Sequence, residues 1–184
     1  DWLIETTDEN NQLVMPYINH FVTEKANVYC NKIKSQVREG VSGDGQMIIN
    51  SGLLPIESGA ACMLYGKNVY PNFAHKFETS IIINPVSGIW NQKNTTYSYG
   101  YKNLKELSNP NDKWNWVEDD ETMQFSIQQC KTMNQPFCMM IITVSTHSPF
   151  SSPRKSHLSF CDGTPQIVQD YLNCMHYADS CIGV

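Results

Sequence analysis

The sequence has 184 residues, of which 13 are basic and 18 are acidic, so its formal charge is −5. With 41% hydrophobic and 11% aromatic residues it can build a core, which excludes a disordered chain. The acidic balance and the lack of a basic cluster argue against a nucleic-acid partner, because phosphate binding requires clustered lysine and arginine. No apolar run approaches the roughly 18 residues that a membrane helix needs.

The two ends of the sequence indicate a piece of something larger, and its cysteines give no sign of a metal or disulfide framework. The sequence opens on Asp1 and stops at Val184 within a helical pattern, so we expect a segment whose targeting information lies elsewhere. The seven cysteines lack CxxC spacing and are odd in number, which favours buried thiols over a zinc site or a closed disulfide framework.

Helical and extended patterns alternate along the chain. The expected elements, in order, are a helix at 15–22, an extended segment at 28–37, a glycine-rich bend at 40–45, a short helix at 46–51, a helix at 71–78, a buried strand at 80–84, a loop-rich region at 85–118, a helix at 119–133, a strand at 137–144 and a last helix opening at 164–165. Helices that alternate with apolar strands indicate an α/β fold, with a mostly parallel sheet covered on both faces.

The first candidate site is the glycine-rich bend at 40–45. In sheets of this kind the chemistry collects on loops that leave the carboxyl ends of strands. The hydroxyl of Ser42 would lie at a helix N-terminus, where free N–H groups and the helix dipole favour an anion. Ser42 is therefore a candidate nucleophile toward a phosphate or sulfate ester. The alternative is that Ser42 only caps the helix, with Asp44 adding favourable charge to the first turn.

The second candidate site is the loop that follows the predicted strand at 137–144. His147 is the only histidine of five placed just after a predicted core strand. It is a candidate for donating a hydrogen bond to a ligand oxygen or for transferring a proton. The alternative is a surface histidine, or one that is held by hydrogen bonds without a chemical role.

Five short blocks follow one another along the sequence. They are Gly40-Val41-Ser42-Gly43-Asp44-Gly45-Gln46, Asn50-Ser51-Gly52-Leu53-Leu54-Pro55-Ile56, Trp90-Asn91-Gln92, Thr146-His147-Ser148-Pro149-Phe150 and Tyr177-Ala178-Asp179. Their order and separation resemble the lipoteichoic acid synthase-like sulfatase family of the alkaline phosphatase superfamily. The resemblance implies a three-layer α/β/α sandwich with a mostly parallel sheet. Residues 1–184 would then be a partial catalytic domain that lacks the first strand and the C-terminal half.

The resemblance also implies roles for individual residues. Ser42 takes the place of the metal-bound nucleophile, which would attack phosphorus and give a phosphoserine that an alcohol or water resolves. His147 would lie on the substrate side and help to neutralise the transferred group, while Trp90 and Asn91 would bind substrate. Gln92 stands where many members have a basic residue, which weakens the case for recognition of a glycerophosphate group.

The family's cofactor is a divalent metal, Mn or Mg, with Zn and Ca left open. The family holds it through the nucleophile, an acid at the end of the first strand and a late Asp-His pair. Of these ligands the sequence contains only Ser42. We therefore expect the metal only in the full-length protein and expect this fragment alone to be inactive, with Asp44 supporting the bend.

The expected function is that of a metal-dependent phosphotransferase or phosphohydrolase acting on phosphate esters such as phospholipid head groups. Sulfatases that use formylglycine need a spaced Pro and Arg after the modified residue, and the block from Ser42 to Gln46 has neither. The alternatives are a sulfuric ester hydrolase and a non-catalytic glycan- or lipid-binding relative. The resemblance places the domain outside a bacterial cell membrane, attached through a region absent from this chain.

Overall fold

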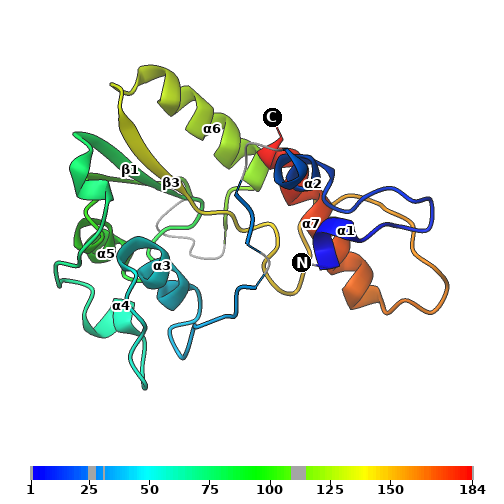
Figure 1. Ribbon diagram of the computed structural model, residues 1–184, viewed down its shortest axis with the longest axis horizontal. Coiled ribbons are helices and arrows are strands. Elements are labelled where there is room, and N and C mark those ends of the chain that lie inside the picture. The colour runs from blue at the N-terminus through cyan, green and yellow to red at the C-terminus, as the bar shows by residue number, and fades with distance from the viewer. Residues whose placement is uncertain (1, 25–27, 31, 109–114, 184) are drawn as a thin grey trace. The chain divides into compact units, whose positions relative to one another are not determined.

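The computed structural model describes residues 2–24, 28–30, 32–108 and 115–183 (Figure 1). The chain forms two compact units: a sheet unit of residues 34–117 and 124–142, and a helical unit of residues 1–33, 118–123 and 143–184. In chain order the elements are α1 (Trp2–Glu5), α2 (Pro16–Thr23), α3 (Ser42–Ser51), α4 (Ala61–Leu64), the 3-10 helix η1 (Ala74–Lys76), β1 (Thr79–Asn84), α5 (Gln92–Ser98), β2 (Asn103–Glu106), α6 (Asp119–Thr132), β3 (Phe137–Ile141) and α7 (Gln166–Ile182).

The three strands form one parallel sheet in the order β2-β1-β3. Ile83 of β1 lies opposite Lys105 of β2 and Ile141 of β3. The apolar sequence of β1 suits a strand that is covered on both faces, and Ile82 and Ile83 are both fully buried. The expected parallel sheet and its central strand are therefore confirmed.

Neighbouring residues of β3 show that helices cover both faces of the sheet. Successive side chains of a strand point to opposite faces. The thiol of Cys130 on α6 lies 3.9 Å from the sulfur of Met139, whereas the side-chain amide of Asn50 on α3 lies 3.4 Å from the sulfur of Met140. Since α6 and α3 meet opposite faces, the sheet unit has the three layers of an α/β/α sandwich.

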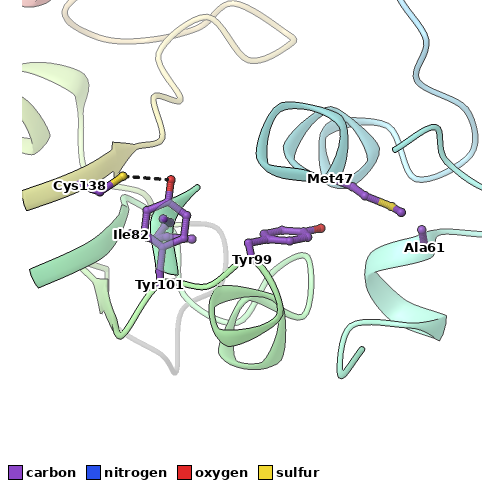
Figure 2. Close-up of a cluster of buried hydrophobic side chains, with 7 residues drawn as sticks. Met47, Ala61, Ile82, Tyr99, Tyr101 and Cys138 are labelled. Atoms are coloured by element: carbon purple, nitrogen blue, oxygen red, sulfur yellow. Dashed lines mark hydrogen bonds between the residues drawn. The ribbon is translucent and has the colours of Figure 1, made fainter. Parts of the chain in front are cut away.

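The main apolar core of the sheet unit lies on the α3 face of the sheet (Figure 2). Tyr99, at the end of α5, is 1% exposed and lies between the strands and the residues of α3 and α4. Burial raises the pKa of Tyr99 far above its usual range, so its hydroxyl stays protonated. The buried members of this core are Met47, Ala61, Ala74, Ile82, Tyr99, Tyr101 and Cys138. This packing fixes the position of α3 and therefore of the bend that precedes it.

The helical unit is organised by α7 and by one of its carboxylates. Asp179 is fully buried and accepts hydrogen bonds from the backbone N–H groups of Tyr17 at 2.8 Å and Ile18 at 2.9 Å. It thus caps the N-terminus of α2, where Pro16 is preorganised for the first helical turn. Val14, Met15 and Leu172 form the buried core of this unit. None of the described helices has the length and apolarity that crossing a bilayer requires.

Most of the expected elements are present, but the region around β1 differs from the prediction. The helix expected at 71–78 is reduced to η1, because the chain is already extended at Phe77 before it enters β1. The region expected to be loop, 85–118, contains α5 and β2. The sequences of both elements are short and polar, so neither shows the apolar periodicity that signals a helix or a strand.

Two further boundaries differ from the expected ones. The strand expected to run to Val144 ends at Ile141: the N–H of Ile142 still donates to Ile83 O, but the N–H of Val144 donates to Asp119 at the start of α6. The described residues of the segment at 28–37 belong to no helix or strand. The helices expected at 15–22, 119–133 and from 164–165 are confirmed as α2, α6 and α7.

Candidate active site

The bend before α3 is held by a buried carboxylate and by a strained residue. One oxygen of Asp44, Oδ2, accepts hydrogen bonds from the backbone N–H groups of Arg38 at 2.9 Å and Gly40 at 3.1 Å. A Cβ at position 40 would lie 2.0 Å from the other oxygen of Asp44, so any other residue there would displace this carboxylate. Val41 has φ +46°, a conformation that costs a β-branched residue about 1–3 kcal/mol. The expected structural role of Asp44 is confirmed.

Ser42 is the first residue of α3 and is exposed. The N-cap is Val41 and no side chain caps the helix, so the alternative that Ser42 serves as the cap is wrong. Within the described residues, neither the hydroxyl nor the backbone N–H of Ser42 donates a hydrogen bond, whereas the N–H groups of Gly43 and Asp44 both donate to Gly40 O. The first turn therefore presents the hydroxyl and one N–H group at the positive end of the helix.

The turn at Trp90 and Asn91 lies against the start of α3. Both residues have positive φ, +48° and +53°. A Cβ added to Gly43 would lie 2.6 Å from the sulfur of Cys62 and 3.6 Å from Cδ1 of Trp90. The side chain of Asn91 donates a 2.9 Å hydrogen bond to Cys62 O, so α3, α4 and this turn meet at one place. The structure thus brings together Ser42, Trp90 and Asn91.

The side chains of this turn are used in different ways. Trp90 is half-buried beside the start of α3. Asn91 donates to Cys62 and accepts a 2.7 Å hydrogen bond from the side chain of Asn94, so its amide shapes the turn. Gln92 is 1% exposed, and its amide has no hydrogen-bond partner among the described residues. Its side chain is therefore turned into the protein rather than toward an exposed substrate surface.

Cys62 is the residue of this site that the sequence did not reveal. Its thiol is buried beneath Gly43, and burial together with the nearby Asp44 carboxylate raises the pKa of this thiol. It therefore stays protonated and acts as packing beneath the bend. A lone cysteine carries no motif, so the only available signal was the run of small side chains that precedes it.

His147 belongs to the helical unit, whereas Ser42 belongs to the sheet unit. The ring is exposed, and Nδ1 lies 2.6 Å from Ser148 O, which requires a proton on Nδ1. The N–H of His147 donates to Val144 O at 2.8 Å, and its carbonyl accepts from Phe150 at 2.9 Å. These bonds make the segment from Val144 to Phe150 a compact turn with the histidine at its middle.

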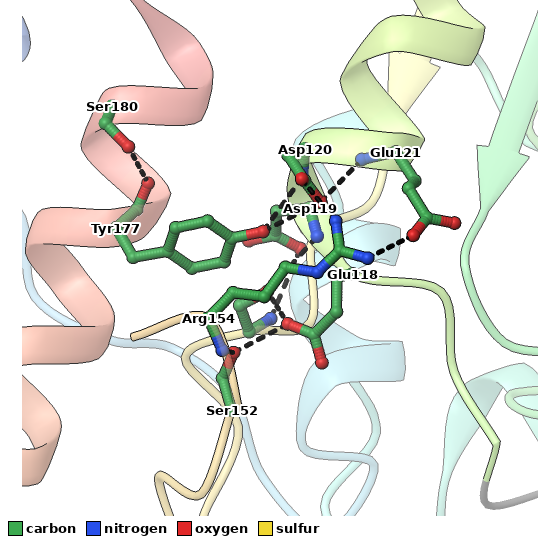
Figure 3. A network of polar contacts seen from close by, with 9 residues as sticks. Glu118, Asp119, Asp120, Glu121, Ser152, Arg154, Tyr177 and Ser180 are labelled. Atoms are coloured by element: carbon green, nitrogen blue, oxygen red, sulfur yellow. Dashed lines mark hydrogen bonds and ion pairs between the residues drawn. The ribbon is translucent and has the colours of Figure 1, made fainter. Parts of the chain in front are cut away.

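Acidic residues at the start of α6 hold this turn (Figure 3). Asp119 is fully buried and accepts hydrogen bonds from the N–H groups of Val144 at 2.8 Å and Ser145 at 3.2 Å. Burial raises the pKa of Asp119 even though these hydrogen bonds oppose the shift. Glu118 accepts hydrogen bonds from the hydroxyls of Ser145 at 3.1 Å and Ser152 at 2.6 Å.

The described residues do not form a complete metal site. They contain no group of three or more histidine, cysteine, aspartate or glutamate side chains that could hold an ion. Ser42 offers one exposed oxygen, but Asp44 is committed to two backbone N–H groups of the bend. The side chains present near Ser42 therefore do not fit a bound metal by themselves.

Comparisons with known proteins agree with this architecture. The chain is 20% identical to the lipoteichoic acid synthase-like protein YvgJ of Bacillus subtilis, over 94% of this chain and 30% of the relative. It is 21% identical to a lipoteichoic acid synthase of Staphylococcus saprophyticus, over 92% of this chain and 28% of the relative. The chain thus spans less than a third of the curated relatives that it matches.

Solved structures show the same fold. The lipoteichoic acid synthase LtaP of Listeria monocytogenes matches with a TM-score of 0.80 and 20% identity, over 95% of this chain and 45% of that one. A protein of the alkaline phosphatase superfamily from Vibrio parahaemolyticus matches with a TM-score of 0.69 and 18% identity, over 95% and 44%. The expected fold class is thereby confirmed. Since the family model described as Sulfatase also matches residues 67–184, this chain belongs to the Sulfatase family.

Proposed function

We propose that this chain is part of an enzyme that transfers or hydrolyses a phosphate-ester group, with Ser42 as the nucleophile. The observation that carries the proposal is the exposed Ser42 hydroxyl at the first position of α3, which makes no hydrogen bond within the described residues. Membership of the Sulfatase family supports ester chemistry, and the relatives named lipoteichoic acid synthases support a lipid-linked phosphate ester as the substrate.

The proposed reaction has two steps that share one intermediate. In the first step Ser42 Oγ forms a bond to phosphorus, the bond from phosphorus to the leaving alcohol breaks, and that alcohol gains the proton that the serine loses. In the second step water or an acceptor alcohol attacks the phosphoserine and restores the serine hydroxyl. Water as the acceptor gives hydrolysis, and an alcohol gives transfer.

The rigid bend explains why Ser42 suits this role. The Asp44 hydrogen bonds and the packing of Gly43 against Cys62 fix the backbone before and after the serine. The N–H group of Ser42 and the helix dipole would stabilise negative charge on the transferred group. We propose that Trp90 forms a wall of the substrate cleft, with Asn91 holding the turn, and that His147 neutralises charge on the phosphoryl oxygens.

The metal requirement is also a proposal. Enzymes of the alkaline phosphatase superfamily generally use divalent metal ions. A divalent ion at Ser42 would stabilise the serine alkoxide and the charge on phosphorus. We propose that Ser42 supplies one ligand and that the others come from parts of the full-length protein outside this chain. We further propose that the whole protein acts outside the cell membrane, in keeping with its likeness to lipoteichoic acid synthases.

The test uses the full-length protein with Mn²⁺ or Mg²⁺, given a phospholipid head-group donor and an aryl sulfate in parallel. We expect turnover of the phosphate ester, and we expect Ser42→Ala to lower kcat by about 10³-fold or more. Mass spectrometry of the quenched reaction should find phosphate on the peptide that contains Ser42. Ser51→Ala is the matched control, because Ser51 lies on the same helix and donates to Met47 O.

Each alternative gives a different result in the same experiment. Turnover of the sulfate alone would identify a sulfuric ester hydrolase. Binding of the lipid donor without turnover of either ester would identify a non-catalytic relative. Unchanged phosphate-ester turnover in Ser42→Ala would show that another residue is the nucleophile.

A further inference from the structure

The loop that carries His147 is tied at both ends to two neighbouring carboxylates. Oδ1 of Asp119 accepts the N–H groups of Val144 and Ser145, where the chain leaves β3. Oε2 of Glu118 accepts the hydroxyl of Ser152, five residues beyond the histidine. Glu118 lies just before α6 and Asp119 is the first residue of that helix, so one short segment holds both ends of the His147 loop.

The contacts are reciprocal, which makes the arrangement specific. The hydroxyl of Ser145 donates to Glu118 at 3.1 Å and accepts the N–H of Asp119 at 3.2 Å. Asp119 is 0% exposed, Ser145 is 2% exposed and Ser152 is 3% exposed, so water does not compete for these groups. A buried N–H group that loses its acceptor must move or go unsatisfied. The position of Val144 and Ser145 therefore depends on Asp119.

The backbone of His147 is hydrogen-bonded to the first of those two residues, Val144. The N–H of His147 donates to Val144 O, and Phe150 donates back to His147 O. A displacement of Val144 is therefore passed to the histidine through a direct hydrogen bond. Ser148 makes no such link to the residues held by Asp119: in the described part of the chain its carbonyl accepts only from the ring of His147.

The start of α6 is itself anchored to the rest of the helical unit (Figure 3). Tyr177 of α7 donates a 2.9 Å hydrogen bond to Asp120, and Arg154 forms ion pairs with Asp120 and Glu121. Each of the four consecutive acids thus has a partner in the protein, and Asp120 and Glu121 share Arg154. This distribution favours a scaffold over a cation site, since a cation site needs carboxylates that converge on one point.

We infer that Asp119 is a positioning residue that, together with Glu118, sets the loop of His147 for the proposed phosphoryl reaction. The inference rests on the proposed function, because it assigns Asp119 a role through His147. Asp119 does not touch substrate. It acts by holding two adjacent N–H groups at the point where the chain turns from β3 toward the histidine. An amide in its place retains the accepting oxygen, whereas a methyl group does not.

The test is a double-mutant cycle in the full-length protein with the phospholipid head-group donor. Asp119→Ala should lower kcat by about 10- to 100-fold, the size expected when a catalytic group is misplaced by about 1 Å. In the His147→Ala background the same substitution should change kcat by less than about twofold, because the group that it positions is gone. Asp119→Asn should recover most of the lost kcat.

The matched control is Asp179→Ala. Asp179 is also fully buried and also accepts two backbone N–H groups, but these belong to α2 rather than to the loop of His147. Its effect on kcat should be the same factor with and without His147. Ser152→Ala gives a milder version of the Asp119 test, useful where Asp119→Ala does not fold, and its smaller loss should also vanish in the His147→Ala background.

The outcomes separate this inference from the proposed function. If Asp119→Ala lowers kcat equally in both backgrounds, or if Ser152→Ala does, the residues are structural and the positioning role is wrong. If Ser42→Ala keeps full activity, the proposed function itself fails. A third result is that Ser42→Ala and His147→Ala both lose activity while Asp119→Ala lowers kcat by the same factor with and without His147. That result would remove the positioning role and leave the proposed function standing.

Discussion

Two buried aspartates shape the two loops that carry Ser42 and His147: Asp44, just after Ser42 in α3 of the sheet unit, and Asp119, at the start of α6 in the helical unit. Both are 0% exposed, both accept two backbone N–H groups through one oxygen, and the other oxygen of each is buried without a hydrogen-bond partner among the described residues. The partners of Asp44 lie four and six residues away, whereas those of Asp119 lie 25 and 26 residues away. The same arrangement, a buried carboxylate oxygen that accepts two backbone N–H groups, therefore holds both a local bend and a loop that is distant in sequence.

The difference in sequence separation has a physical consequence. The bend at Ser42 is held within its own segment, so it needs only α3 and its core packing to be in place. The loop of His147 is held by a residue on the other side of β3 in the chain, so it needs α6, β3 and the turn after it to assemble first. The first loop is a local structure and the second is a product of the tertiary fold.

The largest expected effects come from removing each aspartate. Asp44→Ala and Asp119→Ala each leave two buried N–H groups without their acceptor, which should lower the free energy of unfolding by about 2–5 kcal/mol. Hydrogen–deuterium exchange in the full-length protein should locate the damage. Asp44→Ala should speed exchange at Arg38 and Gly40, and Asp119→Ala should speed it at Val144 and Ser145. Faster exchange in the other loop would contradict the conclusion that each aspartate holds only its own loop.

Substitution of glycine should test how tightly the local bend is built. Gly40→Ala places a Cβ 2.0 Å from Asp44 Oδ1, so the carboxylate must shift, and we expect a loss of about 1–3 kcal/mol in a urea denaturation curve. Gly45→Ala is the control, since its Cβ would meet nothing closer than 3.7 Å. Alanine in that helical position should stabilise the protein by about 0.5–1 kcal/mol. Equal losses at both positions would show that the bend is not specially crowded.

The same contrast explains what could be predicted from the sequence. The role of Asp44 was predictable because the residue belongs to the glycine-rich block that it supports. The role of Asp119 was not, because an acidic residue at the start of a helix is also what the helix dipole favours. Nothing in the sequence distinguishes that surface role from a buried acceptor whose donors follow 25 residues later.

The fold shows the same limit. The apolar strands β1 and β3 were predictable because their composition matches burial on both faces. The edge strand β2 and the helix α5 were missed because their residues carry little apolar periodicity, and the register with Ile81 to Asn84 fixes β2 instead. The burial of the Gln92 side chain could not be predicted from the sequence either, since it depends on how α5 packs.

The raised pKa of Asp119 can be tested by measuring the free energy of unfolding of wild type and Asp119→Asn as a function of pH. Because burial raises the pKa of its carboxyl above the ordinary 3.8, the folded protein holds that proton more tightly than the unfolded chain does. This stabilisation is complete below pH 3.8 and is lost as pH rises through the folded value. Wild type should therefore lose stability relative to Asp119→Asn over that window, with a slope below about 1.4 kcal/mol per pH unit. A parallel pair of curves from urea unfolding would contradict the shift.

The smallest expected effect concerns Tyr177, which supports the start of α6. Tyr177→Phe removes the 2.9 Å hydrogen bond to Asp120 and should lower the free energy of unfolding by about 0.5–1.5 kcal/mol at neutral pH. Although burial raises the pKa of Asp120, hydrogen bonds from Arg154 and Tyr177 hold it below the ordinary 3.8. The carboxylate therefore stabilises the fold above pH 3.8, and this contribution is lost as pH falls through the lowered value. The difference between the variant and wild type in urea unfolding should shrink in that acid window. A difference that stays constant through that window would show that the hydrogen bond to the Asp120 carboxylate does not carry the effect.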